Sequence, residues 1–331
     1  MSSLHVLSTF PPSVEPSCAR IKLADNVGIA LSEAAQQDPR IFVLDGDLAD
    51  SDGAHHFAQR HPRRFLMAGI AEQGMVSTAA GMAEAGVRPW VFSFAAFLCC
   101  RAFDQIRIGV SQSRLPVTLV GSHGGGLSGR NGKTHAAPND IAWMLSLPEI
   151  AVWAPTDALD VRMSVSAILS GSAPAYLRTP RARFAPDDTL PGDAALMRWL
   201  APIRPITLVS TGLGSRWALE TAERLAIEGL DVGVLHLPRV RPLPAVEQAL
   251  HGVETVVIIE DHSRFGGLAS LLAARFPGRE LHAFGWPPDY PGASGDDEAL
   301  RTWHGLSAEA LARAVRAIAD RDAFVHPEPF A

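Results

Sequence analysis

The sequence predicts an α/β protein made of two doubly wound domains whose sheets are mostly parallel. Short apolar segments alternate with longer segments of helical spacing along nearly all of the 331 residues. A stretch rich in Pro, Asp and Gly, from Phe184 to Pro202, interrupts this alternation and resembles a linker. A chain of this length has room for two domains, and we expect them at residues 1–188 and 189–331.

The first domain is predicted to begin with a helix after a Pro-rich leader. Residues 19–35 have apolar positions at helical spacing, and Pro39 ends the helix. A second helix, residues 72–85, is closed by Gly86, a residue favoured at helix C-termini. The other expected helices are 95–110 and 141–147, and the expected strands are 41–47, 64–69, 89–94, 115–122, 150–155 and 174–180.

The second domain repeats the alternation. Strands are expected at residues 205–210, 231–237, 254–260 and 280–285. Helices are expected in the stretch ending at Leu230, at residues 267–276, and from Ser307, a natural N-cap, to about Asp320. No internal repeat of 20–50 residues is visible, which argues against a solenoid.

Composition narrows the functional classes. The net charge is −6 without a run of like charges, so neither a nucleic acid nor a membrane is expected as a partner. The longest apolar patch, Trp90 to Cys100, is too short to span a bilayer. The N-terminus lacks the pattern of a secretory signal, and three cysteines do not make a disulfide framework. We expect a cytoplasmic protein.

Two motifs favour structural interpretations. The segment TGLGSRW has Trp217 where a dinucleotide fingerprint wants its third glycine, which favours a tight turn before a helix. The turn LDGDLADSDGAHH is acidic, but its twelfth position is His56 rather than the glutamate of a calcium loop. The adjacent His55 and His56 lack the helical spacing of paired zinc ligands. A solvated acidic turn is the default, and no metal ligand is expected in this chain.

Two other features leave a structural and a functional interpretation open. The glycine-rich stretch from Gly121 to Gly132 lacks the spacing of a phosphate-binding loop and could merely be flexible. It nevertheless carries His123, with His135 just beyond, where ligands of open α/β sheets bind. Glu72 opens a helix, where the helix dipole favours a carboxylate, but a buried acid requires a partner or a function.

Taken together, these segments resemble the C-terminal half of transketolase. The resemblance covers nearly the whole chain, most strongly from Phe42 to Asp157 and more loosely after Leu190. It rests on DGDLADS, GIAEQGMVSTAAGMAEAGVRPWVFSFAAF, FLCCRAFDQI, GKTHAAPND and EDHSRFGGLAS, in that order. The 1-deoxyxylulose-5-phosphate synthases and the beta subunits of pyruvate dehydrogenase-type decarboxylases share this layout. The resemblance implies a pyrimidine-binding domain for thiamine diphosphate, followed by the C-terminal domain of the family.

The resemblance also assigns cofactor-binding residues. Glu72 matches the catalytic glutamate of the family. The carboxylic acid of that glutamate is hydrogen-bonded to the pyrimidine ring and promotes proton transfer within the cofactor. Glutamine would keep the hydrogen bond but could not share the proton. Phe94 and Phe97 match aromatic residues that stack on or flank the pyrimidine, although Phe97 could equally be core. Asp47 and Leu48 match an Asp-Leu pair at the edge of the cofactor.

Substrate contacts are implied in the same way. His123 and His135 match histidines that contact the sugar donor and assist proton transfers. Ser51 and Arg178 resemble positions that bind the terminal phosphate of a sugar phosphate, although Arg178 could instead form a surface ion pair. The usual phosphate-contacting arginine cannot be placed near Arg20 and Lys22. The loop GRNGKTH departs from the Asp-Gly-Pro-Thr-His of transketolases, so Asn131 and Lys133 could change substrate preference.

The family's diphosphate cradle is missing from the sequence. That cradle combines Gly-Asp-Gly with an asparagine about 30 residues on, whereas Asp45-Gly46-Asp47 is a near miss and no asparagine lies between Asn26 and Asn131. We therefore expect a split transketolase that forms a heterotetramer. Its N-terminal-type subunit would bind the diphosphate and supply most of the ligands of Mg²⁺. The alternatives are a subunit of a deoxyxylulose-phosphate-synthase-like or 2-oxo acid decarboxylase-type enzyme, and a non-catalytic scaffold.

Overall fold

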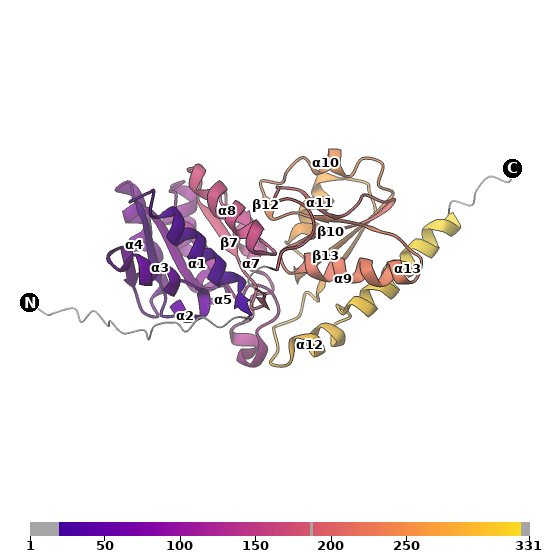
Figure 1. Ribbon diagram of the computed structural model, residues 1–331, viewed down its shortest axis with the longest axis horizontal. Coiled ribbons are helices and arrows are strands. Elements are labelled where there is room, and N and C mark those ends of the chain that lie inside the picture. The colour runs from indigo at the N-terminus through magenta and orange to yellow at the C-terminus, as the bar shows by residue number, and fades with distance from the viewer. Residues whose placement is uncertain (1–19, 186–187, 326–331) are drawn as a thin grey trace, which may run out of the picture.

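The computed structural model describes residues 20–185 and 188–325, which form two α/β lobes (Figure 1). The first lobe is built on a seven-stranded sheet in the order β12-β6-β7-β5-β4-β2-β3. Its strands pair in parallel except β12, which lies antiparallel to β6. They are β2 (Ile41–Asp45), β3 (Phe65–Met67), β4 (Arg88–Phe94), β5 (Thr118–Ser122), β6 (Ala151–Trp153), β7 (Ala175–Arg178) and β12 (Arg239–Arg241).

Helices cover both faces of this sheet. Alternate residues of β4 face opposite cores: Val91 packs in the core that contains Met75 of α4, whereas Phe92 packs in the core that contains Leu31 of α1. The helices are α1 (Leu23–Ala34), α2 (Ala49–Asp52), α3 (His55–Arg60), α4 (Glu72–Glu84), α5 (Ala95–Arg101), α6 (Phe103–Gln105), α7 (Asp140–Leu145) and α8 (Ala158–Ser170). Shorter turns are η1 (Pro62–Arg64), the π-helical η2 (Ile106–Gln112) and η3 (Gly129–Thr134).

The second lobe has a five-stranded sheet in the order β14-β13-β10-β11-β9. Its strands are β9 (Arg198–Ala201), β10 (Ile206–Thr211), β11 (Gly233–His236), β13 (Thr255–Ser263) and β14 (Leu281–Trp286). Only β9 runs antiparallel to its neighbour. The helices are α9 (Gly214–Ile227), α10 (Val246–Ala249), α11 (Leu268–Arg275), α12 (Asp297–Trp303) and α13 (Ala308–Val325). Helices α9 and α13 share one core, and α10 and α11 share the other.

The predicted fold class is confirmed, with local differences. Helix α8 was not predicted; its N-cap is Asp157, which accepts a hydrogen bond from the N–H of Asp160 at 2.9 Å. The interpretation of 184–202 as a linker was wrong at its end, because β9 lies there as an edge strand. The helix expected at 95–110 is divided into α5, α6 and η2. A separate two-stranded ribbon joins β1 (Ile21–Lys22) to β8 (Arg183–Phe184).

Two sequence interpretations of the second lobe hold. Gly212 has a φ of 52° in the tight turn before α9, so TGLGSRW is a strand-to-helix turn. Ser307 caps the last helix, since its Oγ accepts the N–H of Ala310 at 3.3 Å. Within residues 20–185 and 188–325, every helix is too short or too polar to span a membrane.

Candidate active site

Glu72 is a buried acid with two partners. It is the first residue of α4 and only 1% of its surface is exposed. Arg101 Nη1 donates to Glu72 Oε2 at 2.6 Å, and Ser93 Oγ lies 3.4 Å from Oε1. The positive end of α4 adds a favourable interaction with the carboxylate. Because Arg101 is itself half exposed, the acid lies just beneath the surface rather than in the core.

Four predicted residues gather in one aromatic cluster next to Glu72. Phe94, at the end of β4, lies 3.9 Å from His123 and 5.7 Å from Phe97 between ring centroids. His135 meets Phe97 edge-on at 5.1 Å. The guanidinium carbon of Arg101 lies 4.8 Å from the centroid of Phe97. The structure therefore brings the segment of Phe94 and Phe97 together with the loop that carries His123 and His135.

His123 is held as a neutral imidazole. It follows β5 with a φ of 55°, a left-handed conformation unusual for a residue other than glycine. Burial lowers the pKa of His123 to about 3, and the nearby positive charges of Arg181 and Lys22 contribute further. A neutral ring at pH 7 offers one nitrogen as donor and one as acceptor. His123 is therefore suited to hydrogen bonds with hydroxyl groups rather than to pairing with anions.

A cleft of about 470 Å³ opens beside this cluster. It includes Phe94 and His123 together with the predicted substrate residues Ser51 and Asn131. Four basic residues also line it, and they were not predicted to bind substrate: Arg20, Lys22, Arg181 and Arg183. A pocket with neutral hydrogen-bonding groups at one part and several cations at another suits a polar ligand with an anionic group.

Arg178 does not line this cleft, so its assignment as a phosphate ligand is corrected. Its side chain is 3% exposed, and its Nε donates to Asp140 at 2.8 Å. Its Nη2 lies 3.7 Å from Asp261 Oδ2, which also rules out the surface ion pair. Nε and Nη2 of Arg178 are thus committed to groups of the protein rather than to the cleft. Arg181, three residues further on, reaches the cleft instead.

The acidic turn after β2 is only partly solvated. Asp47 is exposed with a φ of 69°, and Leu48 is half-buried, but neither lines the cleft. Asp45 and Asp52 are fully buried, which contradicts the expectation of a solvated turn. Asp45 accepts the N–H of Leu48 at 2.8 Å, and burial raises the pKa of both acids. Asp45 thus stabilises the turn through Oδ1, whereas its Oδ2 is buried without a hydrogen-bond donor.

Two other polar clusters are accounted for by their surroundings. Ligand atoms of Asp25, His55 and His56 lie within 4.8 Å of one another, but the ammonium of Lys22 is 3.6 Å from Asp25 Oδ1. A cation is therefore already in place there.

The second cluster has the order of a catalytic triad. Ser215 Oγ lies 2.6 Å from His236 Nδ1, and His236 Nε2 lies 2.9 Å from Asp160. All three side chains are fully buried, so no substrate can reach the hydroxyl.

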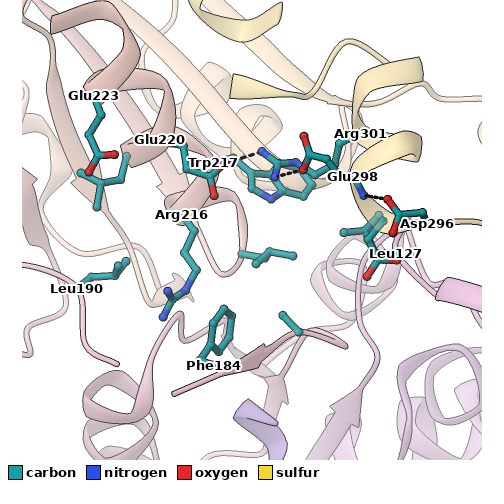
Figure 2. A pocket seen from close by; sticks show the side chains of 14 residues that line it. Leu127, Phe184, Leu190, Arg216, Trp217, Glu220, Glu223, Asp296, Glu298 and Arg301 are labelled. Carbon is teal, nitrogen blue, oxygen red and sulfur yellow. Dashed lines mark hydrogen bonds and ion pairs between the residues drawn. The ribbon is translucent and has the colours of Figure 1, made fainter. Parts of the chain in front are cut away.

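A larger hollow of about 520 Å³ lies between the two lobes (Figure 2). Its two arginines already have partners in the protein. Arg301 donates hydrogen bonds to Glu298 at 2.9 Å and to Glu220 at 2.8 Å. The guanidinium of Arg216 lies over the ring of Phe184. No residue predicted to bind cofactor or substrate lines it. The smaller cleft beside Glu72 is therefore the candidate active site.

Comparison with known proteins settles the family. The description "transketolase, pyrimidine binding domain" matches residues 19–186, and "transketolase, C-terminal domain" matches residues 198–311. The chain belongs to the transketolase family. It is 34% identical to a 6-deoxy-6-sulfo-D-fructose transketolase subunit of Clostridium sp. (strain MSTE9), over 91% of this chain and 96% of the relative.

Other members of the family differ in length. A solved structure described as a split gene transketolase, inactive beta4 tetramer, is 30% identical with a TM-score of 0.77 and covers 90% of this chain and 98% of its own. A 1-deoxy-D-xylulose-5-phosphate synthase of Anaeromyxobacter sp. (strain Fw109-5) is 34% identical over 87% of this chain. This chain spans only 47% of that synthase but nearly all of the two split subunits.

Proposed function

We propose that this chain is the pyrimidine-side subunit of a split, thiamine diphosphate-dependent transketolase. It transfers a two-carbon ketol unit between sugar phosphates or related acceptors once a partner subunit completes the active site. The observation that carries this proposal is the buried Glu72 beside the cluster of Phe94, Phe97, His123 and His135, at the edge of a basic cleft.

The residues around Glu72 fit the pyrimidine of the cofactor. The planar guanidinium of Arg101 lies over the ring of Phe97 and donates a hydrogen bond to Glu72. An aminopyrimidine is also planar and can form a hydrogen bond with the same carboxyl group. We therefore expect it to occupy the position of the guanidinium once Arg101 moves. Phe97 would stack on it and Glu72 would hold a proton at a ring nitrogen. When bound, thiamine diphosphate supplies the carbon nucleophile that carries the ketol unit.

In this proposal the cleft binds the sugar substrate. Neutral His123 would bond to hydroxyl groups near the reacting carbon, with His135 as the second histidine. Arg20, Lys22 and Arg181 would hold an anionic terminal group, with Ser51 as a further donor. Asn131 also lines the cleft, and its amide would contact hydroxyl groups of the sugar. The chain's own residues thus bind and orient the substrate and control one proton.

The diphosphate and Mg²⁺ belong to the partner subunit in this proposal. The near-miss motif Asp45-Gly46-Asp47 does not line the cleft, so the oxygen ligands that magnesium prefers are assigned to the partner. Family members that match this chain over nearly their whole length are split subunits, which supports a partner that carries the missing half. A heterotetramer in the cytoplasm completes the proposal.

A deoxyxylulose-phosphate-synthase-like subunit is the second candidate, because such a synthase is 34% identical over 87% of the chain. It would use the same Glu72 and the same cleft, and would differ in taking its two-carbon unit from a 2-oxo acid. Assay of the assembled enzyme with a ketose phosphate and with pyruvate as alternative donors separates the two.

Calorimetric titration of thiamine diphosphate with Mg²⁺ tests the proposal. We expect binding to the mixture with the partner subunit and not to this chain alone. Glu72→Gln should lower the rate of ketol transfer at least ~100-fold, as loss of a positioned acid does. Glu84→Gln, at the exposed opposite end of α4, is the matched control and should leave the rate unchanged. Tight Mg²⁺-dependent binding to this chain alone would contradict the shared site, and absence of binding in both settings would favour a scaffold.

A further inference from the structure

A segment of the second lobe runs along the histidine loop of the first. Between β14 and α12, Ala293 bridges Leu127, and the N–H of Gly295 donates to Gly129 O at 3.1 Å. Tyr290 donates its hydroxyl to Gly126 O at 3.2 Å. These contacts tie residues 287–296 to residues 126–129, so the second lobe takes part in shaping the cleft.

This segment delivers a carboxylate into the basic cleft. Asp297, the first residue of α12, lines the cleft together with Arg181. Its Oδ2 lies 3.4 Å from Arg181 Nη1, whereas its Oδ1 is buried and has no hydrogen-bond donor. The neighbouring Asp296 is the N-cap of α12 and faces the larger hollow, where Figure 2 labels it. Asp297 also borders that hollow, so of the two adjacent acids only Asp297 reaches the basic cleft.

We propose that Asp297 is a specificity-determining residue that weakens the preference of this cationic cleft for the doubly charged terminal group of a sugar phosphate relative to a singly charged group such as a sulfonate. This inference rests on the proposed function, because it concerns the substrate of the same site. An anion that reaches Arg181 must compete with Asp297 and remain close to its negative charge. A phosphate ester carries a charge of about −1.5 to −2 at pH 7, so it meets more repulsion than a sulfonate of charge −1.

The size of the effect follows from Coulomb's law. A charge about 7 Å from Asp297, in surroundings with an effective dielectric constant of about 20 and partly screened by salt, changes affinity by roughly tenfold per unit charge. Asp297→Asn keeps the shape of the side chain and removes the charge. The ratio of the dissociation constants for phosphate and sulfonate sugars should therefore fall about three- to tenfold in this variant. Both affinities can also improve, because Arg181 is released.

Calorimetry on the assembled enzyme with D-fructose 6-phosphate and 6-deoxy-6-sulfo-D-fructose measures this ratio. The ratio should differ between the wild type and Asp297→Asn at pH 7.5, and this difference should shrink at pH 5, where the phosphate approaches a single charge. Asp296→Asn removes the same charge one residue away, outside the cleft, and retains a good N-cap residue, so it should change the ratio clearly less than Asp297→Asn does.

Other results would overturn the inference. A ratio that is the same in the wild type and in Asp297→Asn would contradict it, as would an equal change in Asp296→Asn. If thiamine diphosphate binds as expected but neither sugar does, the inference about specificity fails and the proposed cofactor site stands. If the cofactor also fails to bind, the proposed function fails as well.

Discussion

Replacing Arg198 with methionine should weaken the junction between the two lobes severely. Arg198 belongs to β9 and is fully buried, with Nη1 2.9 Å from Asp157 and 3.0 Å from Asp160. Its Nε also donates to Pro191 O at 2.9 Å. The two aspartates belong to the first lobe and β9 to the second, so this cation joins both. Methionine retains the apolar part of the side chain and removes the charge.

The size of the stability loss follows from the two buried carboxylates that lose their cation. Burial would raise the pKa of Asp160, but the hydrogen bond from His236 and the charge of Arg198 outweigh it and lower the pKa. Without Arg198, Asp160 retains His236 and the backbone N–H of Thr156, and Asp157 retains only backbone donors. Loss of one partner from a buried ion pair costs about 3–5 kcal/mol, and each lost neutral hydrogen bond about 1 kcal/mol. We expect the free energy of unfolding to fall by about 4 kcal/mol.

Urea unfolding followed by tryptophan fluorescence and by circular dichroism measures this loss. Arg224→Met is the matched control, because its partner Glu228 is four residues away on an exposed surface and the pair contributes about 0.5 kcal/mol or less. A loss below about 1 kcal/mol in Arg198→Met would refute the reasoning, since it would mean that water or another cation compensates the two buried acids. Separate transitions of the two lobes would show that the junction alone has been lost.

Two further changes test the histidine loop. The pKa of His123 is about 3 in the folded chain, below that of a free histidine, so its contribution to stability is present above pH 6.5 and is lost as the pH falls. Between pH 6.5 and 4 the wild type should lose about 3 kcal/mol more unfolding free energy than His123→Asn, and equal pH profiles would contradict this. Gly126→Ala would place a methyl group 2.3 Å from Trp286 and should cost about 2 kcal/mol or more in a thermal unfolding scan. Gly74→Ala, on α4 with nothing within 4 Å, should be neutral or stabilising, and an equal loss in both would refute the steric explanation.

Periodicity was sufficient for the main elements of the fold. It failed where pairing is non-local and segments are short: β9 and β12 have four and three residues, and each becomes a strand only through an antiparallel partner far away in sequence. Helix α8 was missed because serines and small residues dilute its apolar face, which packs through Val161, Val165 and Ile168. Its start was nevertheless marked by Asp157, a residue favoured as an N-cap.

The site shows the same division between local and distant information. The resemblance selected Glu72, Phe94, Phe97, His123 and His135, and the structure places the four rings in one cluster beside Arg101, the partner of Glu72. The same resemblance chose Arg178 over Arg181, since nothing in the letters RTPR tells which guanidinium points at Asp140. Arg101 was missed although it was quoted within FLCCRAFDQI. Asp297 is 116 residues from Arg181 and belongs to the other lobe, so no local pattern could connect them.

The glycines of the histidine loop are required for close packing rather than for flexibility. A Cβ on Gly125 would lie 2.0 Å from Asp261, and one on Gly132 would lie 2.3 Å from Ser294. Asp261 accepts the N–H of Gly126 at 3.0 Å and the Nε1–H of Trp286 at 2.7 Å. The late motif EDHSRFGG, which contains Asp261, therefore acts on the active site through the backbone of this loop. The second lobe thus fixes the loop that carries both histidines of the candidate site.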